Sequence, residues 1–264
     1  MAIAYAVVTG VSVLVFGPSL ASIGIPTLVL FCLVTDGIVR PASGVLVPVV
    51  TRVGPALGAV ALTFDDGPDP QFTPQLLDVL ARYDARATFF CIGRHIEREP
   101  DLARRIAATH ELANHSYAHS RLLNFRGVRH MEAEIRRGEA AIRQVLGTVE
   151  PEGPSLYRPP VGLKNPPLAA VANRLGLTVV AWSIHSRDTR ESSAQTIASR
   201  VLSRVRAGDI ILMHDGCDRG SGTDAGAGRS ATVEAVELIL DGLSKKGLRS
   251  ATVSELITPN GVGR

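Results

Sequence analysis

Short apolar segments alternate with amphipathic helical patterns along the chain from residue 59 onward. The first apolar run, residues 59–64, predicts a buried strand, and residues 73–83 then place Leu76, Leu77 and Leu80 on one helical face. The further strands that we predict span 87–92, 178–184, 209–213 and 249–253, and the further helices span 101–109, 131–146, 167–175, 194–205 and 232–246. Strands that alternate with helices are typical of parallel α/β proteins. Roughly six such units suit a barrel better than a small sandwich, so we predict a distorted parallel (β/α) barrel of about seven strands.

The first fifty residues have a different composition, because Asp36 and Arg40 are their only charged side chains. Two apolar stretches, 1–16 and 20–34, flank Gly17-Pro18-Ser19. A helix that crosses a bilayer needs about 20 apolar residues, so each stretch is slightly short and the two together exceed one ordinary span. Four alternatives follow: a membrane hairpin, one tilted or kinked span, a cleaved signal peptide, and a buried pair of core helices.

Neither a signal peptide nor a core helix pair fits this segment well. No Lys or Arg precedes Arg40, and no convincing cleavage site is present. Soluble helices normally carry a polar stripe, which both stretches lack. We therefore predict that residues 1–50 form a membrane anchor of one or two helices and that residues 51–264 form the catalytic domain. Arg40 and Arg52 favour a cytoplasmic position for that domain, but two arginines leave its side of the membrane open.

Charge and cysteine content exclude some classes of protein. The net charge is +3, and no run of Lys or Arg forms a stripe that would bind nucleic acid. The cysteines, Cys32, Cys91 and Cys217, lie far apart and provide neither a disulfide framework nor the spacing of a cysteine metal site. We expect free thiols and no nucleic-acid partner.

Polar side chains with catalytic or ligating chemistry gather near the predicted strand ends. In chain order they are Asp65, Asp66, His115, His119, Arg158, His185, Asp188, His214 and Asp215. The carboxyl ends of parallel strands meet at one face of a barrel, where active sites form. An Asp-Asp turn or a His-x-x-x-His spacing alone is weak evidence for a functional site. Their joint occurrence at strand ends predicts that they form one site.

The residue types in this set suggest a metal-assisted hydrolysis. Two adjacent carboxylates repel each other, and a divalent cation that binds one of them removes that cost. His115 and His119 are four residues apart and can face one ion, so with Asp66 they form a two-histidine, one-carboxylate set suited to Zn²⁺ or another first-row metal. Asp65 is then placed to act as a general base, and His214 can protonate a leaving amine.

At this point the sequence resembles the polysaccharide deacetylase family, also called the NodB-homology domain or carbohydrate esterase family 4. The resemblance covers about residues 56–258. The motifs that carry it are Thr63-Phe64-Asp65-Asp66-Gly67-Pro68, His115-Ser116-Tyr117-Ala118-His119, Arg158-Pro159-Pro160-Val161-Gly162 and Leu212-Met213-His214.

The resemblance implies a role for each motif residue. It makes Asp65 the catalytic base and Asp66, His115 and His119 the ligands of a divalent metal, with Zn²⁺ expected first and Co²⁺, Ni²⁺ or Mn²⁺ as alternatives. Arg158 would orient Asp65, and Asp188 would tune the catalytic acid His214. Val161 would offer a backbone N–H to the oxyanion, Leu212 would line the acetyl pocket, and Trp182 would contact the substrate.

The sequence departs from the family pattern in the substrate groove. Val161 stands where many members have an aromatic residue, and His185 and Thr189 replace an acid and an aromatic residue. We expect a hydrolase that removes an N-acetyl group from an amino sugar of a chitin-like or peptidoglycan-like polymer or oligomer, anchored in a bacterial cell membrane. The alternatives are a deacetylase or deformylase of a polyprenyl-linked amino sugar, an inactive sugar-binding module, and a structural membrane protein.

Overall fold

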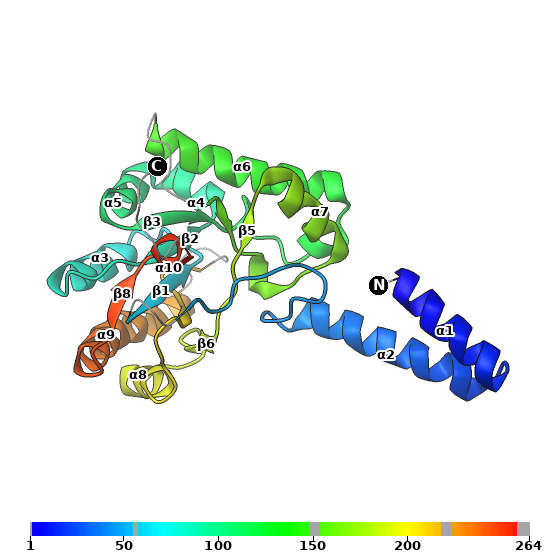
Figure 1. Ribbon diagram of the computed structural model, residues 1–264. Helices are drawn as coiled ribbons and strands as arrows, with labels where there is room; N and C mark the ends of the chain where they lie inside the picture. Colours follow the sequence, from blue (N-terminus) through cyan, green and yellow to red (C-terminus); the bar gives the residue numbers. More distant parts are fainter. Residues whose placement is uncertain (1, 55–57, 148–153, 218–222, 258–264) are drawn as a thin grey trace.

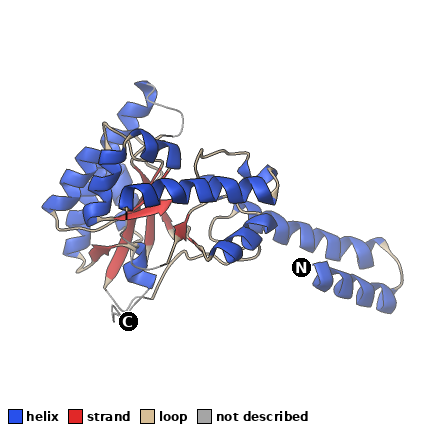
Figure 2. Ribbon diagram, turned by 90° about the horizontal axis from the view of Figure 1, so that it is seen from above, coloured by secondary structure: helices blue, strands red, loops and turns tan. Residues whose placement is uncertain are grey.

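The computed structural model describes residues 2–54, 58–147, 154–217 and 223–257 (Figure 1). An apolar helical hairpin projects from a larger α/β domain, and the two parts are distinct in both ribbon views (Figures 1 and 2). The hairpin comprises α1 (Ala2–Phe16) and α2 (Leu20–Val39).

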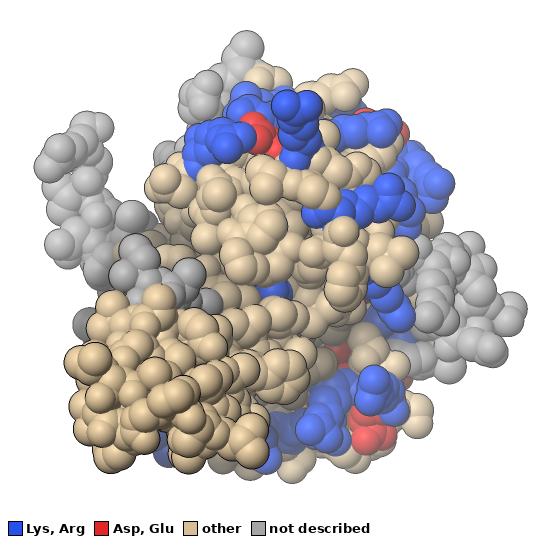
Figure 3. Space-filling model, turned by 90° about the vertical axis from the view of Figure 1, so that its right-hand side faces the viewer, with Lys and Arg blue, Asp and Glu red and all other residues tan. Residues whose placement is uncertain are grey.

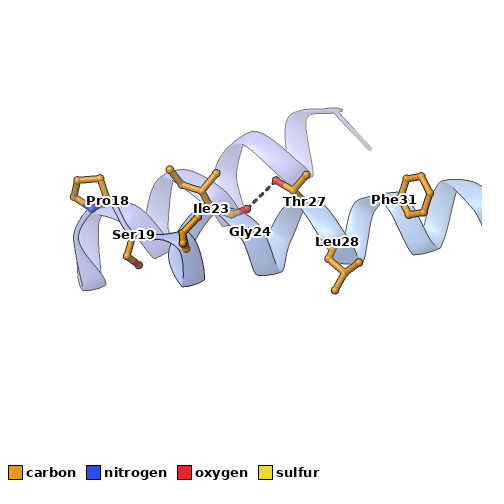
Figure 4. A pocket seen from close by; sticks show the side chains of 8 residues that line it. Pro18, Ser19, Ile23, Gly24, Thr27, Leu28 and Phe31 are labelled. Carbon is orange, nitrogen blue, oxygen red and sulfur yellow. Dashed lines mark hydrogen bonds between the residues drawn. The ribbon is translucent and has the colours of Figure 1, made fainter.

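The break between the two helices lies at Gly17, whose φ of 73° is in the left-handed region, and at Pro18. Ser19 then caps α2 by accepting a hydrogen bond from the backbone N–H of Ser22. Within α2 the Thr27 hydroxyl donates to the Ile23 carbonyl at 2.8 Å (Figure 4), and it also contacts the Tyr5 hydroxyl of α1 at 2.9 Å. These bonds pair the Tyr5, Ser19 and Thr27 side chains within the hairpin, whereas the buried Thr9 hydroxyl has no hydrogen-bond partner among the described residues.

The apolar surface of the hairpin is exposed rather than packed into the domain. Leu14 and Leu20 are 87% and 95% exposed, which excludes the buried pair of core helices. At 1.5 Å per residue, α2 measures about 30 Å, the thickness of the hydrocarbon core of a bilayer, whereas α1 measures about 22 Å. By length and composition α2 is the one described helix able to cross a membrane, although a signal sequence would pass the same test.

The α/β domain is built on a parallel sheet in the order β5–β4–β3–β2–β1–β7–β6, with β8 paired to the first half of β1. The strands are β1 (Ala59–Asp65), β2 (Thr88–Cys91), β3 (Glu111–Asn114), β4 (Leu156–Tyr157), β5 (Thr178–Val179), β6 (Ile184–His185), β7 (Ile210–His214) and β8 (Arg249–Ala251). All seven residues of β1 are buried, as expected of a central parallel strand.

The sheet curls until its two ends approach each other. β5 and β6 stand at opposite ends of the strand order, yet only residues 180–183 separate them in the chain. At no more than about 3.6 Å per residue, these ends lie within roughly 18 Å of each other. The predicted parallel barrel is therefore confirmed as a curled, incompletely closed one. The predicted single strand 178–184 is wrong in one respect, because β5 pairs with β4 while β6 pairs with β7.

The segment between the hairpin and β1 lies across the opening between the two ends of the sheet, where it pairs with Val180, directly after β5, and with Asp209, directly before β7. The Val50 N–H donates to the Val179 carbonyl at 2.9 Å, and the Val50 carbonyl accepts from Ala181 at 2.8 Å. Farther along, Arg52 pairs with Asp209 at 2.6 Å, and Val47 is buried. These residues cover part of the opening in the wall of the barrel.

Helices cover the outside of the sheet (Figure 2). They are α3 (Thr73–Arg82), α4 (Gly93–Arg98), α5 (Pro100–Thr109), α6 (Val128–Leu146), α7 (Pro166–Leu175), α8 (Ala194–Leu202), α9 (Thr223–Lys245) and α10 (Val253–Ile257), with short 3₁₀ turns η2 (Leu123–Phe125) and η3 (Pro160–Gly162). Their apolar faces pack on the strands, with Phe64 and Phe89 stacked 5.0 Å apart in the main core. The packing holds the strand ends in fixed positions.

Candidate active site

The polar residues predicted at strand ends meet at the carboxyl edge of the sheet. Asp65 ends β1 and is the register partner of His214, which ends the neighbouring β7. His115 directly follows β3, and Arg158 directly follows β4. Parallel strands bring these side chains, up to 149 positions apart in the numbering of the chain, to one edge.

Asp66, His115 and His119 converge as a candidate metal centre. One ligand atom from each lies within 4.8 Å of the other two. The Nε2 atoms of His115 and His119 lie 3.6 and 3.4 Å from Asp66 Oδ1, a buried oxygen that has no hydrogen-bond partner in the described part of the chain. His115 Nδ1 donates to the Arg158 carbonyl at 2.7 Å, so its Nε2 lone pair is free to face an ion. These residues fit a divalent cation.

The backbone around these ligands is held in unusual conformations. Asp66, Ser116 and His119 have φ values of 74°, 65° and 51°, each of which costs about 1–2 kcal/mol for a residue with a Cβ atom. Local hydrogen bonds stabilise them. The Asn114 side chain accepts from the Ser116 N–H at 2.8 Å, the Ser116 hydroxyl accepts from the His119 N–H at 3.1 Å, and His95 Nδ1 lies 2.9 Å from the Asp66 carbonyl.

Asp65 is paired with Arg158, which is completely buried. Arg158 Nη1 donates to Asp65 Oδ1 at 2.6 Å and to the Thr63 hydroxyl at 2.8 Å, and Nη2 donates to the Ala181 carbonyl at 3.0 Å. Its guanidinium also stacks 3.9 Å over the Phe90 ring. Burial lowers the pKa of Arg158, while Asp65 counteracts that effect. The second oxygen of Asp65 lies 3.7 Å from His115 Nε2 and so faces the candidate metal centre.

His214 and Asp188 form a buried ion pair on the other side of Asp65. Asp188 accepts hydrogen bonds from His214 Nδ1 at 3.0 Å, the His214 backbone N–H at 2.8 Å, the Ser186 hydroxyl at 2.9 Å, the Thr232 hydroxyl at 3.1 Å and Arg229 at 3.3 Å. Burial alone would raise the pKa of Asp188, but the charge of His214 and its hydrogen bond hold it well below the usual value. Burial alone would lower the pKa of His214, but Asp188 outweighs it and the pKa is raised. The pair favours the protonated form of the imidazole of His214, the register partner of Asp65.

The three residues predicted to contact the substrate lie around the candidate active site, outside the hydrogen-bonded pairs described above. Val161 lies in η3 with a φ of 51° and is 47% exposed. Leu212 is buried in β7, in register with Thr63. Trp182 is half-buried, with its ring 5.7 Å from the guanidinium of Arg158 and 5.7 Å from the ring of His185.

Asp215, for which no role was predicted, is wholly buried next to His214. It accepts a hydrogen bond from Thr73 at 2.6 Å, and burial raises its pKa to about 7. A Cβ atom on Gly67 would lie 2.0 Å from its carboxylate oxygen, so the Asp-Asp-Gly turn can sit above Asp215 only because residue 67 is glycine. The glycine in the Asp-Asp-Gly motif could have indicated that another group packs closely against this turn.

The surface has two hollows, of which one borders this site and the other lies away from it on the hairpin. A cavity of about 380 Å³ includes Trp182 and His185 in its lining and extends toward residues 40–42. A larger hollow, about 730 Å³, lies along α2 (Figure 4) and is lined by hairpin residues alone. Only the first adjoins the catalytic set.

Comparisons with known proteins agree with this geometry. Residues 54–180 match the family model for polysaccharide deacetylase. The chain is 38% identical over 201 residues to a peptidoglycan-N-acetylglucosamine deacetylase of Bacillus cereus, covering 75% of this chain and 87% of that protein. It is 39% identical over 202 residues to a chitooligosaccharide deacetylase of Sinorhizobium fredii, with 75% and 91% covered.

A solved structure extends the likeness to three dimensions. A peptidoglycan N-acetylglucosamine deacetylase crystallised with an N-oxidanyl-benzamide superposes with a TM-score of 0.71 at 30% identity, over 79% of this chain and 92% of that one. Sequence and fold therefore lead to one conclusion: the chain belongs to the polysaccharide deacetylase family, and it is a hydrolase of the amide-cleaving type found there.

Proposed function

We propose that this enzyme removes the N-acetyl group from amino-sugar units of a polysaccharide or oligosaccharide related to peptidoglycan or chitin. Its relatives are named as deacetylases of N-acetylglucosamine in peptidoglycan and of chitooligosaccharides. The observation that carries the proposal is the placement of Asp65 between two centres, with one oxygen facing the ligand set and the other held by Arg158.

Asp66, His115 and His119 would hold a divalent metal ion, and Zn²⁺ suits this donor set best. When bound, such an ion polarises an acyl carbonyl and lowers the pKa of a water molecule to about 7. His115 is fixed in the tautomer that presents Nε2, because its Nδ1 donates to a backbone carbonyl.

The protein residues handle the protons of the reaction. Asp65 accepts a proton from the attacking water, and its salt bridge to Arg158 fixes its orientation without blocking the second oxygen. His214 donates a proton to the amine as the C–N bond breaks, and Asp188 keeps that imidazole charged. The Val161 N–H would stabilise the oxyanion, and Leu212 and Trp182 would contact the acyl group and sugar. Retention of all these groups argues against an inactive module.

We further propose that the hairpin anchors the enzyme in a membrane. α2 has the length of one span, and its apolar side chains are not used by the core of the domain. The substrate would then be drawn from the layer next to the bilayer surface.

Asp65→Asn tests the assignment of the base. Asparagine keeps the size of the side chain but cannot take a proton, so we expect acetate release from N-acetylated oligosaccharides to fall by about 10²–10⁴-fold. Metal content, measured by mass spectrometry on the same sample, should be unchanged because Asp65 is not in the ligand set. Asp78→Asn, on the exposed side of α3, is the control and should be fully active. Normal activity of the Asp65→Asn enzyme would disprove the assignment of Asp65 as the base. Activity that survives complete removal of metal by a chelator would disprove the metal dependence of the reaction.

A further inference from the structure

The cavity beside the catalytic residues is lined by an unusual concentration of arginines. Its volume is about 380 Å³, and its lining comes from residues 40–42 directly after α2, from residues 182–187 around β6, and from α8 and the turn that follows it. The arginines are Arg40, Arg187, Arg200 and Arg204. Among the described lining residues there is no Asp or Glu.

The protein neutralises only part of this charge. Arg40 pairs with Asp36 at 2.9 Å, and Arg200 pairs with Glu191 at 3.6 Å and donates to the Ser186 carbonyl. The side chains of Arg187 and Arg204 make no hydrogen bond or ion pair with any residue that the structure describes. Guanidinium groups suit carboxylate and phosphate oxygens, which they bind in bidentate fashion. Four of them around one hollow predict an anionic ligand.

The cavity adjoins the reacting centre through His185. The ring of His185 lies 6.3 Å from the ring of His214 and 5.7 Å from that of Trp182, so one side chain separates the cavity from the predicted catalytic acid. The Arg187 N–H donates to His185 Nδ1 at 3.0 Å, which fixes the histidine against the arginine loop. A sugar whose acyl group reaches Asp65 and His214 would therefore extend past His185 toward the arginines.

The opposite rim of the cavity is the point where the chain leaves the hairpin. The buried Lys164 donates to the Arg40 and Pro41 carbonyls at 2.8 and 2.6 Å, which ties the end of α2 to the domain. Figure 3 looks onto this side of the molecule: the hairpin is an uncharged projection in the foreground, and Lys and Arg predominate among the charged side chains around it. An anion in the cavity would lie near the surface of the membrane that the hairpin enters.

We propose that this arginine cavity binds the phosphate or diphosphate that joins an N-acylated amino sugar to a membrane lipid. The inference rests on the proposed function and specifies its substrate class: an amino-sugar unit or oligomer that is still joined through phosphate to a membrane lipid. The sugar would lie over His185, between the arginines and the catalytic residues, and the lipid chain would run along the hairpin into the bilayer.

The test compares substrates on the full-length protein in detergent micelles. The substrates are an N-acetylglucosamine joined through phosphate to a short polyprenyl chain, lipid-free N-acetylglucosamine 1-phosphate, and a neutral N-acetylated chitotetraose. We expect Arg187→Gln and Arg204→Gln each to raise KM about tenfold for both phosphorylated substrates, which corresponds to about 1.4 kcal/mol. Their kcat, and all activity on the neutral oligomer, should remain unchanged. Arg190→Gln, on the same loop but outside the cavity lining, is the matched control and should alter none of these values.

Other outcomes separate the competing explanations. If Arg187→Gln and Arg204→Gln leave both phosphorylated substrates unaffected but weaken binding to phosphatidylglycerol vesicles relative to phosphatidylcholine vesicles, the cavity holds a phospholipid headgroup and the inference is wrong. Equal effects on neutral and phosphorylated substrates would also overturn it. Failure of the unaltered protein on every substrate would instead contradict the proposed deacetylation.

Discussion

Asp188 has no direct contact with the predicted metal ligands, yet it sets the protonation state of the group that faces them. Its carboxylate is wholly buried and keeps the pKa of His214 above the ordinary value despite the opposing effect of burial. An imidazole donates a proton only while it is charged, so its pKa determines the pH above which the reaction slows. Asp188 is a positioning residue whose effect is visible in a pH profile.

Asp188→Asn should move the alkaline limb of the kcat profile to lower pH. Without the carboxylate, burial and the nearby Arg229 both favour the neutral imidazole, so the pKa of His214 falls. In the unaltered enzyme, activity declines only above the raised pKa of His214. In the variant it would decline at lower pH, and kcat at neutral pH would drop. An alkaline limb at the original pH would show that His214 is not the titrating acid. Asp84→Asn, at an exposed turn, serves as the control.

The sequence predicted side chains that the structure brings together at one edge of the sheet, but not the residues that hold them there. Asp65, His115 and His214 were predicted because their chemistry is tied to residue type and motif. Thr63 and His95 were given no role, because each reaches the site through a hydrogen bond to a partner that only the fold brings near, Arg158 for the first and the Asp66 carbonyl for the second. Asn114 was also missed, although its partner, the Ser116 N–H, is only two residues away. A hydroxyl or amide in a strand carries no such signal in a single sequence.

At the scale of elements, the apolar patterns located most helices and strands but not the crossing between β5 and β6. Residues 178–184 form one apolar run, which predicts one strand. In the structure the Val180 and Ala181 carbonyls accept from Arg158 and so divide the run into two strands on different partners. The break coincides with a buried arginine from another strand end and with the pairing of Val50 to Val180, neither of which periodicity can reveal.

Gly162 lies at the contact between the arginine motif and the segment that leaves α2. It has a φ of 71°, and an added Cβ atom would lie 2.7 Å from the Trp182 ring and 2.9 Å from Pro41. Gly176 has a similar φ of 63° but open space around it. A comparison of substitutions at the two positions therefore separates the effect of backbone strain from the effect of steric crowding.

Gly162→Ala should destabilise the protein more than Gly176→Ala. Both variants carry about 1–2 kcal/mol of left-handed strain, and only the first adds an overpacking cost of about 1–3 kcal/mol. Thermal unfolding of the full-length variants in the same detergent measures the difference. Equal losses of stability would mean that Trp182 and Pro41 move away freely, and that the end of α2 is not packed against the site.

For the whole molecule, the boundary between the apolar hairpin and the α/β domain lies closer to α2 than the composition indicates. A change in composition near residue 50 marks the end of the apolar zone, but it carries no information about which residues pack on the barrel. Val47 is buried beside Leu123, Met131 and Tyr157, and Val50 bridges β5 through two backbone hydrogen bonds. The segment 41–50 thus belongs structurally with the barrel although its sequence resembles the hairpin.

A chain that begins at Pro41 should be more stable than one that begins at Thr51. Burial of Val47 contributes about 1.5–3 kcal/mol, and two backbone hydrogen bonds contribute about 1 kcal/mol each, so the shorter chain should lose roughly 3–5 kcal/mol. Urea unfolding of the two truncated proteins, followed by circular dichroism, measures this difference directly. Both should stay in the supernatant when centrifuged with lipid vesicles, while the full-length protein should sediment with them. Identical unfolding midpoints would show that segment 41–50 belongs to the anchor, and co-sedimentation of the truncated chains would assign membrane binding to the domain itself.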